Sequence, residues 1–362
     1  MKAVRLLEYG GQLVFNDVPT PAIARDEILV KIKSTAVNHL DLVKASGTAR
    51  QILPIDLPWI PGHEFSGVVE QIGSDVAAYA PGDAVFAANE TGGAYAEYLA
   101  VKPAAIARKP SNLSFEEAAS VPVASQTAWQ ALFTHGHLEK GQTILIHGGA
   151  GAVGAYAVQL ASHAGATVIA TASGDDEAYL NSIGASRVID YREAQFEKVL
   201  REKVDVVFDL VGGDAQKRSF LVLKEGGHLV SAVQPVSQEE AAMHHVSGVM
   251  MRLAPSGDGS AESGDCWKRG QYDQTLRPCT HSKMQPRPGR TSPRNCQGFM
   301  GCRPVGRKRQ DASHTARSCF VCPRHLPRVT YVLAHGWAYC KRAEGSLRFL
   351  AGARKGRQVI FC

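Results

Sequence analysis

Apolar and polar positions form short blocks in the first part of the chain. Between residue 1 and about residue 120, short apolar runs are separated by turn sequences such as TyrGlyGly, ProGlyHis and ProGlyAsp. This pattern predicts strands and favours a small barrel-like β domain. The predicted strands are Ala3–Leu6, Leu13–Val18, Glu27–Ala36, Ser66–Ile72, Asp83–Ala87 and Tyr95–Val101. One helix is expected near Asn38 and another over Ser114–Ala119, where Ser114 and Glu117 have capping-box spacing.

From about residue 121 to residue 254 the pattern changes to alternating strands and helices. The predicted strands are Thr143–His147, Thr167–Thr171, Arg187–Ile189, Val204–Leu210 and His228–Val233. Helical stretches separate them, and glycines follow several of these stretches. Such alternation predicts an α/β fold, with a doubly wound parallel sheet and right-handed crossovers.

A glycine-rich turn links the first of these strands to its helix. The turn residues are Gly149, Ala150, Gly151, Ala152, Val153 and Gly154. The G-x-G-x-x-G spacing supplies a tight turn, a bare backbone for a pyrophosphate and close packing of helix on strand. The N-terminus of the helix adds free N–H groups and the positive end of a dipole. We therefore predict a dinucleotide site here.

The pattern ends near Leu253, and the composition changes with it. All eight cysteines lie beyond residue 265. Residues 255–362 hold 20 lysines and arginines against 6 acidic residues, a net charge of +14, whereas residues 1–254 have a net charge of −8. No period of 2 or 3.6 is present in this basic tail. We interpret residues from about 257 onward as translated out of frame and expect them to be disordered, with a genuine basic tail as the alternative.

Nine segments of residues 1–254 together resemble the medium-chain dehydrogenase/reductase superfamily, and specifically its zinc-independent quinone oxidoreductase-like branch. They include AlaValAsnHisLeuAsp, GlyHisGluPheSerGlyValVal and PheAspLeuValGlyGly, and they occur in family order. Their positions are 36–41, 58–69, 82–86, 92–98, 126–132, 147–154, 184–192, 208–213 and 223–231. The resemblance implies a GroES-like β-barrel-type domain over 1–120 and a Rossmann domain over 121–254. Because the tail replaces the family's closing strands, we expect the first domain to be incomplete.

The same resemblance argues against a metal. A Cys stands in zinc-dependent relatives where this chain has Asn38, and a second Cys near Val121–Ala124 is also missing. His63 and Glu64 remain, but zinc requires three protein ligands in a catalytic site. We predict no zinc in residues 1–254.

The choice of cofactor depends on the end of the second strand of the parallel sheet. NAD sites place an acid there to bind the ribose 2′-hydroxyl. Here Ser173 leaves room for a 2′-phosphate, and Tyr191 and Arg192 match the family's TyrArg pair. Asp175 and Asp176 oppose a phosphate by charge. We predict NADP (NADPH) over NAD.

The resemblance also implies positions near the nicotinamide, namely Asn38 and Thr127, with Val211 and Gly212 passing beside the cofactor. Asp41 is equally compatible with a catalytic role and with a helix cap. The implied reaction is hydride delivery from NADPH to a small-molecule quinone or enone, with hydrogen bonds to the developing oxyanion and a proton from solvent.

Two alternatives remain open for the function. The first is a dinucleotide-binding protein with little or no turnover, because the catalytic domain is incomplete. The second is a basic-tail module that attracts nucleic acid nonspecifically through sequences such as GlyArgLysArg (306–309). We expect no membrane span, a cytoplasmic location, and the homodimer that is usual in the family.

Overall fold

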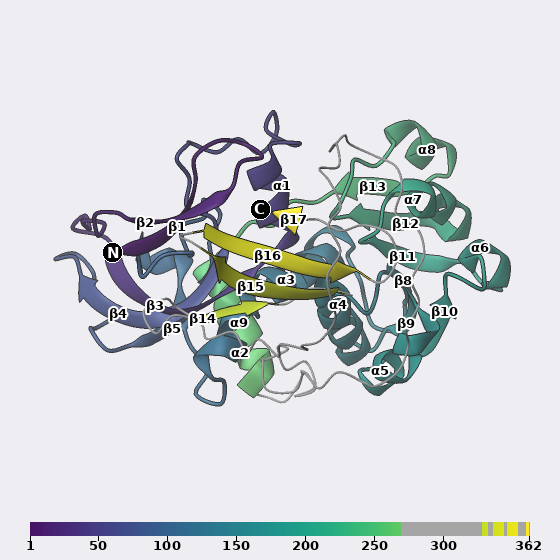
Figure 1. Ribbon diagram of the computed structural model, residues 1–362. Coiled ribbons are helices and arrows are strands. Elements are labelled where there is room, and N and C mark those ends of the chain that lie inside the picture. Colours follow the sequence, from purple (N-terminus) through teal and green to yellow (C-terminus); the bar gives the residue numbers. More distant parts are fainter. Residues whose placement is uncertain (269–327, 332–335, 344–345, 354–359, 362) are drawn as a thin grey trace, which may run out of the picture.

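The computed structural model describes residues 1–268, 328–331, 336–343, 346–353 and 360–361 (Figure 1). The first domain contains β1 to β7, which are Lys2–Leu6, Leu13–Asp17, Ile28–Val37, Glu64–Ile72, Ala84–Ala88, Tyr98–Val101 and Ala107–Arg108. Helices α1 (His39–Ser46) and α2 (Phe115–Ala119) and the short helix η1 (Pro103–Ala105) complete it. The capping box predicted for α2 is confirmed, since the Ser114 and Glu117 side chains accept each other's backbone N–H.

Two sheets form the first domain, as the GroES-like prediction requires. One has the order β3–β4–β5–β7 with β6 also on β3, and the other begins with the antiparallel pair β1–β2. Single bridges from Ala3 to Ala96 and from Leu6 to Trp59 join the sheets. The predicted strand Tyr95–Val101 is shorter in the structure, because Tyr95 and Glu97 hydrogen-bond to β1 instead.

The second domain is a parallel six-stranded sheet with the order β10–β9–β8–β11–β12–β13. The strands β8 to β13 are Thr143–His147, Thr167–Ala172, Arg187–Asp190, Val204–Asp209, Leu223–Ser231 and Ser247–Met250. Its helices are α4 to α8, which are Ala152–His163, Glu177–Ser182, Phe196–Val199, Gly213–Ser219 and Gln238–Met243, with η3 (Gly174–Asp176) and η4 (Phe220–Val222) between them. The predicted doubly wound parallel sheet is confirmed, and β13 is an additional edge strand.

Helix α3 (Pro122–Trp129) and the π-helical turn η2 (Gln130–His135) connect the two domains. A single hydrophobic cluster extends from Phe86 of the first domain through α3 to α4 and the parallel sheet. The domains therefore share a core. No helix in the part of the chain that the structure describes is long and apolar enough to cross a membrane.

Secondary structure continues into the segment predicted as a tail. Helix α9 (Gly257–Lys268) packs on α3, where the Ser125 hydroxyl meets Ser263 at 2.7 Å and the Gln126 amide donates to Ser260 at 2.9 Å. Ordered contacts thus extend beyond residue 255, the predicted start of the tail. Further strands are β14 (Arg328–Tyr331), β15 (Gly336–Ala343), β16 (Ser346–Ala353) and β17 (Ile360–Phe361).

These four strands join the first domain, with β14 beside β3 and β16 beside β2. Figure 1 shows the β15–β16 hairpin as the yellow arrows across the front of the molecule. Residues 269–327, with the basic sequence at 306–309, lie outside the described residues. The out-of-frame interpretation of the tail stays a prediction.

Candidate functional site

The glycine turn lies at the carboxyl end of β8, where the strand order of the parallel sheet reverses. The backbone at Gly148 has φ +72°, and the Gly149 N–H donates to Thr171 O at 3.0 Å on the neighbouring strand. A Cβ on Gly154 would lie 2.3 Å from Gly148 O, and one on Gly149 would lie 2.8 Å from the Ala170 Cβ. The turn therefore requires glycine at these positions. It presents bare backbone at the start of α4, which suits a pyrophosphate.

A second loop lies on the other side of this reversal, after β11. Strands β8 and β11 are parallel neighbours, and Gly148 is close to Leu210 and Val211. The fully buried Asp209 carboxylate accepts the N–H groups of Val211 and Gly212 at 2.9 and 2.8 Å. Asp209 therefore shapes the loop that was predicted to pass beside the cofactor.

The predicted phosphate-binding side chains lie together at the ends of β9 and β10. The Arg192 guanidinium forms a double hydrogen bond with Asp190, at 3.1 Å from Nε to Oδ1 and 2.8 Å from Nη2 to Oδ2. The Ser173 hydroxyl donates to Asp176 at 2.5 Å. Tyr191, between Asp190 and Arg192 in the chain, is exposed. The structure thus brings Ser173 and Arg192 to one place, but each already has a carboxylate partner.

In the first domain, Asp41 is the centre of a buried polar cluster. Its Oδ1 accepts the Gly62 N–H at 2.9 Å and lies 2.5 Å from His63 Nδ1, while its Oδ2 accepts the Asn38 N–H at 2.8 Å and the Tyr95 hydroxyl at 3.2 Å. With its side chain saturated and buried, Asp41 is the third residue of α1, where it caps the helix by accepting the backbone N–H of the N-cap residue Asn38, and it anchors the loop before β4. This geometry favours the helix-cap alternative over direct catalysis.

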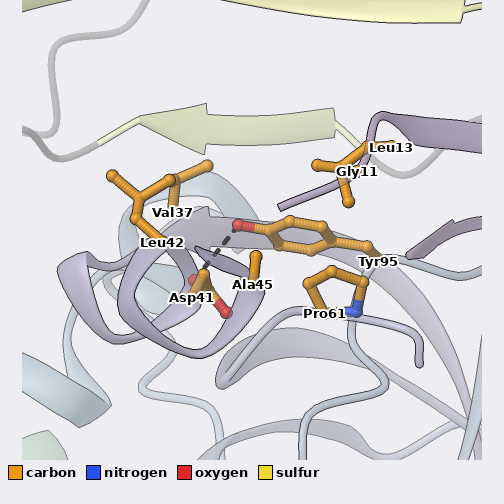
Figure 2. Close-up of a pocket in the computed structure, with 8 residues that line it drawn as sticks. All are labelled: Gly11, Leu13, Val37, Asp41, Leu42, Ala45, Pro61 and Tyr95. Atoms are coloured by element: carbon orange, nitrogen blue, oxygen red, sulfur yellow. Dashed lines mark hydrogen bonds between the residues drawn. The ribbon is translucent and has the colours of Figure 1, made fainter. Parts of the chain in front are cut away.

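A small apolar pocket lies directly beside this cluster. Figure 2 shows the Tyr95 ring against Pro61, its hydroxyl directed at Asp41. The remaining wall is apolar, from residues Gly11, Leu13, Val37, Leu42 and Ala45. Its volume of about 20 Å³ is close to that of one water molecule.

Glu64 connects the two predicted catalytic side chains. Its Oε1 accepts the Asn38 amide at 2.8 Å, and its Oε2 accepts the Val123 N–H in the first turn of α3, also at 2.8 Å. The Thr127 hydroxyl in turn donates to Val123 O at 2.6 Å. Asn38 of the first domain is thereby fixed to α3, which packs against α4 and its glycine turn.

The environment of Glu64 changes its protonation. The side chain is completely buried, and this desolvation raises the pKa of Glu64 to about 8, against the opposing hydrogen bonds from Val123 and Asn38. Asp41 raises it further by charge repulsion. At neutral pH the group connecting the two domains is therefore mainly a neutral carboxylic acid.

The sequence located the glycine turn, the 211–212 loop, Asn38 and Arg192, but it did not identify the carboxylates that hold three of them. Asp209 holds the 211–212 loop, Glu64 holds Asn38 and Asp190 holds Arg192. For Asp209 and Asp190, the available signal was an acid at the last position of a buried strand. Glu64 had no such signal, since its role follows from contacts with helix α3, 59 residues away.

Within the described residues, no group of three or more His, Cys, Asp and Glu side chains is arranged to hold a metal ion. His63 is buried with Nδ1 at Asp41 and with no hydrogen-bond partner at Nε2. Beside it, Asn38 and Glu64 bind each other.

The fold and the glycine turn Gly149–Gly154 define a two-domain dinucleotide-binding protein. The family model "Alcohol dehydrogenase GroES-like domain" matches residues 24–111, and "Zinc-binding dehydrogenase" matches residues 152–251. The chain belongs to the medium-chain dehydrogenase/reductase superfamily.

Individual relatives agree with this assignment. The chain is 39% identical to 2-methylene-furan-3-one reductase of Solanum lycopersicum, over 64% of this chain and 61% of that protein. It is 36% identical to the chloroplastic NADPH-dependent alkenal/one oxidoreductase of Arabidopsis thaliana, over 66% and 64%. The solved quinone oxidoreductase of Coxiella burnetii has 35% identity and a TM-score of 0.69, over 75% of this chain and 88% of that one. The chain spans less than two thirds of the two plant relatives.

Proposed function

We propose that the chain is an oxidoreductase that uses NADPH to reduce a quinone or an α,β-unsaturated carbonyl compound. The observation that carries the proposal is that the glycine turn after β8 meets the loop after Asp209 at the carboxyl ends of two neighbouring parallel strands. The names of the similar proteins, among them an NADPH-dependent alkenal/one oxidoreductase and a quinone oxidoreductase, support the substrate class.

The turn suits a dinucleotide, because a Cβ at Gly149 would clash with the Ala170 Cβ and one at Gly154 with the Gly148 carbonyl oxygen, so that only glycine lets the helix pack closely and leaves bare backbone for a pyrophosphate. The turn Gly149–Gly154 would hold the pyrophosphate, Val211 and Gly212 would lie beside the nicotinamide half, and Ser173 and Arg192 beside the adenosine ribose. When bound, NADPH supplies a hydride to the substrate carbon.

Thr127 and Asn38 differ in the hydrogen bonds that they can offer to the substrate. Thr127 uses its hydroxyl proton on Val123 O, so it offers the substrate only its oxygen. Asn38 has one amide hydrogen bond to Glu64, which orients the rest of that amide group. We assign the donation of a hydrogen bond to the developing oxyanion to Asn38 rather than Thr127, and the proton that completes reduction to solvent.

Zinc independence belongs to the same proposal. It is supported by Asn38, which is not a zinc ligand of the usual type, and by the mutual hydrogen bond of Asn38 and Glu64. A homodimer is a further part of it, supported by β13, which among the described strands is the last one of the parallel sheet. Light scattering on the purified chain measures the oligomeric state.

The test is NADPH oxidation by the purified full chain, followed by absorbance with a panel of quinones and enones, with and without a zinc chelator. We expect turnover that the chelator leaves unchanged. Turnover of simple alcohols with NADP⁺ in the absence of quinone or enone reduction would contradict the proposal. NADPH binding without any turnover would favour the alternative of a cofactor-binding protein.

A further inference from the structure

The end of the parallel sheet near the adenosine ribose has an unusual balance of charges. The carboxylates of Asp190 and Asp175 lie 2.8 and 4.0 Å from the Arg192 guanidinium, and a third carboxylate, from Asp176, accepts the hydroxyl of the adjacent Ser173. A 2′-phosphate brings a further charge of about −1.5 to −2 at neutral pH. The side chains on which its binding depends therefore lie in a site of net negative charge.

Asp190 is held in this site by more than Arg192. Its Oδ2 accepts the Gly174 N–H at 2.7 Å, and its Oδ1 accepts the Arg192 backbone N–H at 2.9 Å. A Cβ on Gly174 would lie 2.7 Å from the same Oδ2, so the loop after β9 approaches the carboxylate closely. Arg192 and these N–H groups lower the pKa of Asp190, which keeps it ionised.

A phosphate can reach Arg192 only by sharing it with Asp190. The double hydrogen bond already satisfies one edge of the guanidinium, and a second anion there is repelled by the carboxylate. The 2′-hydroxyl of NADH carries no charge, and a carboxylate accepts a hydrogen bond from it readily. The arrangement thus disfavours a 2′-phosphate relative to a 2′-hydroxyl.

We propose that Asp190 sets the cofactor preference of this chain: by binding Arg192 it reduces the affinity for the 2′-phosphate, so that the site accepts both NADPH and NADH. This inference rests on the proposed function, because it concerns the adenosine end of the same cofactor site. Asp190 acts here through Arg192 and through its own charge.

The experiment compares dissociation constants of NADPH and NADH for the purified full chain, by fluorescence or calorimetric titration at fixed salt. Asp190→Asn keeps an acceptor for one backbone N–H and removes the charge. We expect it to tighten NADPH binding on the order of tenfold, the value for one charge about 5 Å from a phosphate in a highly solvated site. NADH binding should change by less than about threefold. Asp190→Ser provides a second removal of the charge if the Asn variant folds poorly.

Two matched variants separate the effect of the Asp190 charge from the effect of its contact with Arg192. Asp175→Asn removes the same charge from a carboxylate 4.0 Å from Arg192 that is not hydrogen-bonded to it, and should change the ratio of affinities by about twofold or less. The double variant Arg192→Ala and Asp190→Asn should lose most of the gain in NADPH affinity that Asp190→Asn alone produces. The fragments 2′,5′-ADP and 5′-AMP repeat the comparison without the nicotinamide.

The outcomes distinguish the inference from the proposed function. An increased NADPH preference that depends on Arg192 supports the inference. If the Asp190 variants bind both cofactors but leave the ratio unchanged, or weaken NADPH, the inference is overturned while the proposed cofactor site stands. If the wild-type chain binds neither cofactor, both are overturned.

Discussion

The two ends of the candidate site use carboxylates in opposite ways. Glu64, beside Asn38, is completely buried, and desolvation raises its pKa to about 8. Asp190, at the proposed adenosine end, keeps 13% of its side chain exposed and binds Arg192, which lowers its pKa. Both accept hydrogen bonds from a side chain and from backbone N–H groups. Burial without a cation makes the first a neutral acid, whereas the cation makes the second an anion.

This difference separates structural from electrostatic roles. A neutral Glu64 fixes the geometry of two domains through hydrogen bonds, and adds little charge near the substrate. An ionised Asp190 influences any ligand charge within a few ångströms, but its exposed ion pair adds little to stability. We therefore expect changes at the buried end to alter folding and changes at the exposed end to alter cofactor selection.

The largest expected effect concerns Glu64 and pH. The folded chain keeps the proton on Glu64 up to about pH 8, whereas the unfolded chain releases it near the ordinary value of 4.5. Because the folded state binds the extra proton, this group's contribution to the free energy of unfolding is full below pH 4.5 and is lost as the pH rises through 8. The total loss is of the order of 5 kcal/mol.

Denaturant titrations at pH 5, 7 and 9 measure this dependence. Glu64→Gln removes the titrating group and should flatten the profile across this window, with its greatest gain over wild type at pH 9. The exposed carboxylate variant Glu225→Gln is the control and should retain the wild-type profile. An unchanged slope in Glu64→Gln would contradict a neutral Glu64.

The next effect is steric and concerns the glycine turn, which lies between the Glu64 end and the Asp190 end of the candidate site. A Cβ at Gly154 meets backbone atoms of Gly148 and Gly149, which cannot rotate away. We expect Gly154→Ala to destabilise the chain by about 1–3 kcal/mol and to weaken NADPH binding by at least about tenfold. Calorimetric melts and titrations measure both.

A matched glycine separates close packing from backbone strain. Gly226 has φ +78°, yet a Cβ there meets no atom within 4 Å. Gly226→Ala should therefore destabilise the chain by about 1 kcal/mol through strain and leave NADPH affinity unchanged. Equal losses of affinity in both variants would show that the turn does not contact the cofactor.

The two ends also differ in how far the sequence predicts them. The glycine spacing depends on local geometry, so the turn could be predicted from residues 143–154. The parallel sheet could be predicted from the alternation of strands and helices that follows. The partner of Asn38 could not, because Val123 reaches Glu64 only after α3 packs between the domains. Asp190, the partner of Arg192, lies only two residues before it, but this spacing in the sequence is equally compatible with an Arg192 guanidinium that does not bind Asp190. Only the folded structure distinguishes these two states.

The smallest expected effect on stability is at Arg192. The Arg192 side chain of its ion pair with Asp190 is half exposed, and ion pairs in contact with solvent add little to folding. Arg192→Ala should leave the melting temperature within experimental scatter and weaken NADPH more than NADH, since only NADPH carries the phosphate. Lys2→Ala, which breaks the exposed pair with Asp17, is the control and should change neither quantity. A large loss of stability in Arg192→Ala would mean that the exposed end is structural as well, and the division between the two carboxylates would fail.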